Sequence, residues 1–237
     1  MSEYSNLLRP WPRYSMRFGL ENAYKAGVLG IPRKFWRCEI DRMEPWSEDQ
    51  AAMMNALRDM AEDADPPQAL IVSGVNHCGK TYIGCGVVSF LAFDDGAIRT
   101  TRRADGTEDY VTGHRNPRYV NESDLLNRFT QWSYRDGKDW FSIYSNDCGF
   151  LVIDEFGTNK WTETEARKMC QVLNKRFNNG LQTVILTNRS QTEVFELLSK
   201  DVQSRFYGCL SVSMTHSVEY DDGADRREGG DDQWWLP

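Results

Sequence analysis

The feature that most constrains this chain is the segment 69–81, which reads ALIVSGVNHCGKT. A short apolar run leads into residues that match the phosphate-loop pattern G-x-x-x-x-G-K-[ST] at every fixed position. This pattern predicts a strand, a tight loop and a helix in that order, because the backbone N–H groups must curl around a phosphate. The apolar segment 82–93 would supply the helix, with its N-terminus facing the anion.

We expect this loop to bind phosphate groups together with Mg²⁺. Gly74 and Gly79 permit the sharp backbone path, Lys80 reaches the terminal phosphates, and Thr81 offers its hydroxyl to the metal. The predicted cofactor-binding residues are Gly74, Val75, Asn76, His77, Cys78, Gly79, Lys80, Thr81 and Asp154.

Asp154 belongs to a second apolar strand that ends in carboxylates. The run FLVI at 150–153 is typical of a strand buried on both faces of a parallel sheet, and Asp154 and Glu155 follow it. Asp154 would share the metal with Thr81, and Glu155 would orient or deprotonate the attacking water. A third run, 183–186, ends near Asn188, whose side chain would approach the terminal phosphate or that water.

Composition narrows the class of protein. With 237 residues, of which 40% are hydrophobic, the chain can form one ordinary domain with extensions. The net charge of −7 argues against indiscriminate coating of nucleic acid. Six scattered cysteines without a C-x-x-C pair, and no apolar leader or membrane span, predict a cytoplasmic protein with reduced thiols.

The densest basic stretch follows the predicted phosphate-loop helix. Segments 97–103 and 108–112 are separated by a glycine turn and predict a β-hairpin. Its arginines Arg99, Arg102 and Arg103 are candidates for contacts to DNA, since basic side chains on a protruding hairpin can follow a phosphate backbone. The alternative is a solvated hairpin face on which acidic residues are interleaved with these arginines.

The other segments surround the predicted core. A helix is expected to begin at Ser47, where Gln50 completes a capping-box spacing, and further helices are expected over 122–132 and from Thr162 or Thr164 to Phe177. Residues 1–30 are either a docking arm or a strap on the core. Residues 217–237 form an acidic tail whose composition predicts disorder and whose end either binds a groove or folds back on the domain.

The order of the motifs resembles that of the AAA+ ATPases of the DnaC-type replicative helicase loaders and of the related IstB-type transposition ATPases. The resemblance covers about residues 31–214, so the ATPase domain is expected at 31–216. It implies an α/β P-loop NTPase fold, with an ASCE core, a central parallel sheet flanked by helices and no C-terminal helical lid. The motifs that carry it are the phosphate loop, FLVIDEFG at 150–157, TVILTNRS at 183–190 and QSRFYG at 203–208.

The resemblance also implies roles for particular residues. Asn188 would be the sensor-1 residue, and Arg205 would be an arginine finger presented to the ATP of an adjacent subunit. Glu155, Asn188 and Arg205 are then the catalytic candidates, although Arg205 could also be an ordinary surface arginine. The family usually has a glycine where His77 stands, and a positive φ there costs histidine less than most side chains.

The resemblance implies an ATP-hydrolysing helicase loader. Such a protein would assemble with itself into a ring or spiral, bind single-stranded DNA and deliver a hexameric replicative helicase. A transposition ATPase that acts on duplex DNA and a nucleotide-gated adaptor with little turnover remain alternatives. A small-molecule P-loop kinase is less favoured, because no arginine-rich lid segment follows the fourth core strand.

Overall fold

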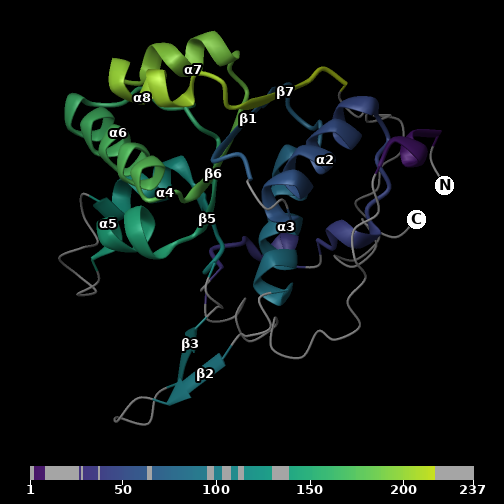
Figure 1. Ribbon diagram of the computed structural model, residues 1–237, viewed down its shortest axis with the longest axis horizontal. Helices are drawn as coiled ribbons and strands as arrows, with labels where there is room; N and C mark the ends of the chain where they lie inside the picture. The colour runs from purple at the N-terminus through teal and green to yellow at the C-terminus, as the bar shows by residue number, and fades with distance from the viewer. Residues whose placement is uncertain are drawn as a thin grey trace, which may run out of the picture.

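The computed structural model describes residues 3–8, 27, 29–36, 38–62, 66–94, 99–102, 108–111, 115–129 and 139–216 (Figure 1). Most of the predicted N-terminal arm, together with Arg103 and the acidic tail at 217–237, lies outside these residues. The domain boundaries at 30 and 216 therefore stay predictions. In the described part of the chain, no helix is both long and apolar enough to cross a membrane.

The core is a five-stranded sheet in the order β4-β5-β6-β1-β7. Neighbouring strands all pair in parallel, so their carboxyl ends meet at one edge. This edge carries the end of the phosphate-loop strand and both other predicted polar strand ends. The strands are β1 Ala69–Gly74, β4 Arg118–Asn121, β5 Phe150–Asp154, β6 Gln182–Thr187 and β7 Leu210–Met214.

Helices cover both faces of the sheet (Figure 1). On one face lie α2 (Glu48–Glu62) and α3 (Lys80–Asp94). Among the helices on the opposite face are α4 Glu122–Asn127, α6 Glu163–Asn178, α7 Gln191–Leu197 and α8 Lys200–Phe206. This arrangement confirms the predicted α/β fold with a parallel sheet between helical layers.

Successive strand residues alternate between two hydrophobic cores. In β1, Leu70 and Val72 pack toward α2 and α3, whereas Ala69 and Ile71 pack toward the other helical layer. Because both faces are covered, the strand is apolar throughout and its side chains are buried at nearly every position. The continuous apolar runs in the sequence are a direct consequence of this two-sided burial.

The predicted hairpin is present and extends away from the sheet at one end of the molecule (Figure 1). Strand β2 (Arg99–Arg102) pairs antiparallel with β3 (Glu108–Val111), and Arg102 lies opposite Glu108 in the register. Arg99 lies opposite Val111 in the same register. The DNA-contact role of these arginines stays a prediction, and the acidic cross-strand neighbour of Arg102 fits the solvated-face alternative.

The helix expected over 122–132 begins as α4 and continues in π-helical conformation at residues 128–129, and residues 130–132 lie outside the described part of the chain. Two other segments differ from expectation. Residues 140–147, which showed no clear pattern, form the short helix α5 (Trp140–Ser142) and the π-helix η5 (Ile143–Asp147). The QSRF motif lies inside a helix, α8, that local pattern did not predict.

A fully buried arginine holds η5 in place. Arg176 of α6 donates to the carbonyl oxygens of Tyr144 (2.6 Å), Cys148 (2.6 Å) and Gln182 (2.5 Å) and to Thr183 Oγ1 (2.9 Å). These partners come from η5, from the loop before β5 and from the start of β6. The position of η5 therefore depends on contacts far away in the sequence.

Short 3₁₀ turns precede the core. They are η1 Glu3–Leu7, η2 Arg33–Phe35 and η3 Ile40–Arg42. The first lies against α2, where Asn55 Nδ2 donates to the carbonyl oxygen of Leu7 at 2.8 Å. For the described residues 3–8, this packing fits a strap on the core better than a free docking arm.

Candidate nucleotide-binding site

The phosphate loop joins β1 to α3 and encloses the amine of Lys80. This side chain is only 7% exposed, and its Nζ donates to the carbonyl oxygens of Gly74 (2.8 Å) and Val75 (2.7 Å) and to Cys78 Sγ (3.3 Å). None of these acceptors is a carboxylate. A buried ammonium that is held by dipoles rather than by a carboxylate suits the binding of an anion.

The backbone of the loop is left-handed at two positions. Gly79 has φ of +93°, and His77 has φ of +63°, as expected for the residue where a glycine is usual. A Cβ at Gly79 would lie 2.6 Å from Gln50 Nε2 and 3.2 Å from Trp46. Gly79 is therefore required for its conformation and for the close approach of the segment before and within α2.

The N-terminal turn of α2 supports the loop from the side. Gln50 is buried and donates through Nε2 to the carbonyl oxygen of Cys78 at 3.0 Å. Its backbone N–H donates to Ser47 Oγ, as the capping spacing predicts. Its side-chain oxygen, however, accepts from the N–H of Trp46 and not from that of Ser47, so the reciprocal half of the expected box is shifted by one residue.

Asp154 and Thr81 are brought together across the carboxyl edge of the sheet. Thr81 Oγ1 donates to Asp154 Oδ2 at 2.6 Å, and the hydroxyl of Tyr119 donates to the same oxygen at 2.6 Å. The other oxygen of Asp154 accepts the backbone N–H of Glu155 at 2.7 Å. A hydroxyl beside a carboxylate provides the hard oxygen ligands that Mg²⁺ prefers, so these residues fit the predicted metal.

Tyr119 is a partner that the sequence analysis did not identify. It lies on β4 and is 4% exposed. Burial, and next the charge of Asp154, raise the pKa of Tyr119 far above its ordinary range. The tyrosine therefore stays protonated and remains a donor to Asp154 at any physiological pH.

Glu155 has an unusual backbone conformation and a side-chain partner on the neighbouring strand. Its φ is +56°, in the left-handed region, and its carboxylate accepts a hydrogen bond from Asn121 Nδ2. The oxygen of the same amide accepts the N–H of Ser123 at 2.9 Å and so caps α4. The parallel register places Asn121 opposite Asp154, which explains why it reaches the next residue.

The loop that follows Glu155 is held by a buried carboxylate, Glu122. It accepts the backbone N–H of Gly157 and, more weakly at 3.4 Å, that of Asn159. Burial raises the pKa of Glu122, and the hydrogen bonds from Gly157 and Asn159 oppose that increase. Asn121 and Glu122 thus attach the start of α4 to Glu155 and to the chain directly after it.

Asn188 approaches the phosphate loop from the end of β6. Its Nδ2 donates to Asn76 Oδ1 at 2.8 Å, across 112 positions of sequence. The preceding residue, Thr187, is buried and donates to the carbonyl oxygen of Phe156 at 2.7 Å. The fold therefore gathers Lys80, Thr81, Asp154, Glu155 and Asn188 around one loop, as the sequence analysis expected.

Arg205 lies away from the phosphate loop. It occupies the last turn of α8, where its guanidinium donates to Asn178 Oδ1 and lies 5.3 Å from the ring centre of Phe177. These partners belong to the C-terminal end of α6 and not to the phosphate loop. Within one chain, the predicted arginine finger is thus separate from the residues gathered at Lys80.

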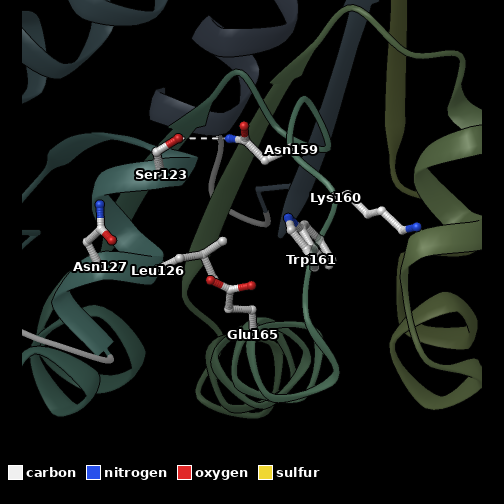
Figure 2. A pocket seen from close by; sticks show the side chains of 7 residues that line it. All are labelled: Ser123, Leu126, Asn127, Asn159, Lys160, Trp161 and Glu165. Carbon is white, nitrogen blue, oxygen red and sulfur yellow. Dashed lines mark hydrogen bonds between the residues drawn. The ribbon is translucent and has the colours of Figure 1, made fainter.

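A small cavity of about 120 Å³ lies beside the loop that follows Glu155 (Figure 2). It is formed by the start of α4, the loop at 159–161 and the start of α6, and Asn159 Nδ2 donates to Ser123 Oγ across it at 2.8 Å. None of the predicted site residues lines this cavity. Its lining consists of Ser123, Leu126, Asn127, Asn159, Lys160, Trp161 and Glu165.

Comparison with known proteins finds similar folds among solved structures only. No protein-family model and no curated protein sequence matches the chain. Among solved structures, it is similar to the DnaC helicase loader (TM-score 0.59, 18% identity), with 77% of this chain and 99% of that chain covered. It is similar to DnaI as well (TM-score 0.56, 13% identity), with 80% and 97% covered.

The replication initiator DnaA, solved with AMPPCP and single-stranded DNA, is a third similar structure (TM-score 0.57, 13% identity). The match covers 78% of this chain and 50% of that DnaA chain, so the likeness concerns about half of the initiator. At such low identities, these matches show the fold. The chain therefore has the P-loop AAA+ fold that the DnaC-type helicase loaders and the replication initiator DnaA share.

Proposed function

We propose that this protein is an ATP-dependent helicase loader of DNA replication initiation. It hydrolyses ATP to ADP and phosphate with Mg²⁺, assembles with itself, binds single-stranded DNA and delivers a hexameric replicative helicase. The observation that carries the proposal is the meeting of Thr81 with Asp154 at 2.6 Å beside the buried amine of Lys80. A buried amine beside a hydroxyl and a carboxylate is suited to bind a triphosphate and its metal.

The residues around the loop divide the chemistry among them. Lys80 and the loop N–H groups hold the phosphates, and Thr81 and Asp154 hold Mg²⁺, which when bound neutralises charge on the phosphate oxygens. Glu155 orients the attacking water and accepts its proton, and Asn188 fixes the position of the terminal phosphate from β6.

In the single chain, Glu155 is bound by Asn121 and Arg205 is bound at the end of α6. Both would have to change partners before hydrolysis. We infer that assembly supplies this change, because an arginine from an adjacent subunit can stabilise the charge that spreads over the transferred phosphoryl group. ATP hydrolysis would then occur only when two subunits are associated.

The partners are proposed from the named structures. A helicase loader and an initiator bound to single-stranded DNA share this fold, which supports a replicative helicase and single-stranded DNA as partners of this chain. A nucleotide-gated adaptor with little turnover is the second candidate. The bond between Asn121 and Glu155 favours it, since that bond occupies the carboxylate needed for hydrolysis.

The test is hydrolysis of ATP by the full chain alone, with single-stranded DNA and with duplex DNA. Stimulation by single-stranded DNA, together with retention of a replicative helicase on the immobilised protein, supports the loader. Stimulation by duplex DNA alone supports a transposition ATPase. ATP binding without turnover under every condition, including the presence of the helicase, supports the adaptor and contradicts the proposed catalytic role of Glu155.

A further inference from the structure

Two exposed apolar side chains adjoin the phosphate loop. Large hydrophobic residues that are exposed in the described part of the chain are few, and they include Trp46 (42% exposed) and Val75 (45% exposed). Val75 is in the loop itself, and the Trp46 indole lies against Gly79, so that a Cβ on this glycine would be 3.2 Å from the ring. An exposed indole beside a ligand-binding loop often marks a surface that a ligand covers.

The arrangement of strands fixes the direction in which a nucleotide must lie. The groups expected at the metal and the terminal phosphate, Asp154, Glu155 and Asn188, come from β5 and β6. Both strands lie on one side of β1, and β7 lies on the other. The nucleoside must therefore leave the loop away from β6, toward β7 and α2.

Trp46 is on that second side. It stands two residues before α2, and α2 is joined to the end of β7 because Asp49 Oδ2 accepts from the N–H of Thr215 at 2.7 Å and is 2.9 Å from His216 Nδ1. On the loop, Val75 donates its N–H to the carbonyl oxygen of Met214 at 3.2 Å. The start of α2, the phosphate loop and the end of β7 are thus joined by hydrogen bonds, and Trp46 stands directly before this α2 turn.

The backbone of Trp46 is also held beside the loop. Its backbone N–H donates to Gln50 Oε1 at 3.1 Å, and Gln50 in turn donates to the carbonyl oxygen of Cys78 at 3.0 Å. The backbone that carries the ring is therefore linked to the phosphate loop by a single buried side chain. A planar group attached beside the phosphate loop is suited to contact a planar base.

We propose that Trp46 is the base-recognition residue of this site, and that the exposed face of its indole stacks on the base of the bound nucleotide. This inference rests on the proposed nucleotide-binding function and assigns its nucleoside side. Lys80 and the loop bind the phosphates whatever is attached to them, and Trp46 distinguishes a nucleotide from a bare polyphosphate.

The test compares two probes, Mg·ATP and Mg·tripolyphosphate, by calorimetry on the full chain. Trp46→Ala is expected to weaken ATP binding about tenfold, the scale of one aromatic–base stack, and to leave tripolyphosphate binding unchanged. Trp46→Phe keeps a ring and should recover most of the lost affinity. Tyr207→Ala removes a more exposed aromatic side chain, 86% exposed, from the end of α8 and serves as the matched control.

A second measurement separates direct contact from support of the loop. ATP should change the tryptophan fluorescence of the wild type, tripolyphosphate should change it less, and Trp46→Phe should lose the ATP-specific part. If Trp46→Ala binds ATP as the wild type does, or loses affinity for both probes equally, the assignment of Trp46 is wrong while nucleotide binding stands. If the wild type binds tripolyphosphate and ATP with equal affinity, base recognition is absent and the inference fails.

Discussion

At the scale of single residues, Asn121 connects the beginning of α4 to the catalytic candidate Glu155. One oxygen caps the helix and one amide N–H group binds the carboxylate, so the two ends of this side chain serve different elements. Glu155 also has φ of +56°, a conformation that non-glycine residues adopt at a cost of roughly 1 kcal/mol or more. Its position is therefore maintained by neighbours and is open to change when they move.

We predict that Asn121→Ser increases the basal hydrolysis of ATP several-fold. Serine keeps a capping oxygen for Ser123, but it is too short to bind Glu155, so the carboxylate is freed while α4 keeps its cap. Steady-state turnover and the thermal midpoint, measured on the same preparation, check this. A lower turnover at an unchanged midpoint would mean that Asn121 holds Glu155 in its productive position.

Substitutions of Lys80 and Glu155 should affect ATP binding and ATP hydrolysis separately. Lys80→Ala is expected to abolish measurable ATP binding, because it removes the buried cation of the loop. Glu155→Gln is expected to bind ATP normally but to hydrolyse it roughly 10²-fold more slowly or worse, since an amide cannot accept the proton of the water. Calorimetry and phosphate release distinguish the two variants, and normal turnover in Glu155→Gln would contradict the assignment.

Much of this site could be predicted from single residues. The spacing of Gly74, Gly79 and Lys80 defines the loop, and the positive φ of His77 follows from its place in the pattern. The bonds of Tyr119 and Asn121 could not be predicted, because they depend on the pairing of β4 with β5, which leaves no local signal. In the sequence, Asn121 is only a polar residue at the end of a short strand, and this alone does not identify its hydrogen-bond partner.

At the scale of elements, the start of α2 is hydrogen-bonded to the residues directly after β7. Asp49 accepts hydrogen bonds from the backbone and hydroxyl of Thr215 and lies 2.9 Å from His216 Nδ1. Burial alone would raise the pKa of Asp49, but the hydrogen bonds from Thr215 and His216 outweigh it and lower the pKa. This carboxylate therefore stabilises the folded state in its charged form.

The sign of that shift gives a pH prediction. A lowered pKa contributes stability above the usual carboxyl value of about 3.9, and that stability is lost as the pH falls through the folded-state pKa. Asp49→Asn should therefore have a lower thermal midpoint than the wild type at neutral pH, and the difference should shrink below about pH 4. Glu48→Gln removes a charge from the same helical turn and serves as the matched control.

The elements whose local sequence contains capping residues or a clear periodicity were predicted well. The sequence predicted a helix from Thr162 or Thr164 to Phe177, and α6 begins with the complete capping box of Thr162 and Glu165 and is followed by Gly180 at φ of +67°. The π-helix η5 was not predicted, because Arg176 positions it through carbonyl oxygens that the fold brings together. Helix α8 was missed because, unlike the equally short α7, it has no capping box, and its N-cap Ser199 makes no side-chain capping hydrogen bond.

At the scale of the whole molecule, the sheet separates the two predicted halves of the catalytic site. The phosphate loop emerges from β1, next to β7 and α2, while Arg205 is held at the end of α6 on the opposite helical layer (Figure 1). One chain therefore carries the phosphate loop at the carboxyl edge of the sheet and Arg205 at the packed ends of α6 and α8. Copies that associate head to tail would bring the two together.

Assembly should therefore depend on bound ATP. We predict that Glu155→Gln, which retains ATP, forms a larger particle with Mg·ATP than with ADP, and that Lys80→Ala remains small with either nucleotide. Light scattering after size-exclusion chromatography checks this. Equal mass of Glu155→Gln with ATP, with ADP and without nucleotide would show that association does not depend on the terminal phosphate.

The most direct test of the account is hydrolysis by a mixture of two inactive variants, Lys80→Ala and Arg205→Ala. Lys80→Ala cannot bind ATP but carries an intact Arg205, and Arg205→Ala binds ATP but lacks the finger. We predict that each variant alone is inactive and that the mixture recovers part of the wild-type rate, because mixed contacts pair an intact loop with an intact arginine. Normal hydrolysis by Arg205→Ala alone, with no gain on mixing, would contradict a site shared between subunits.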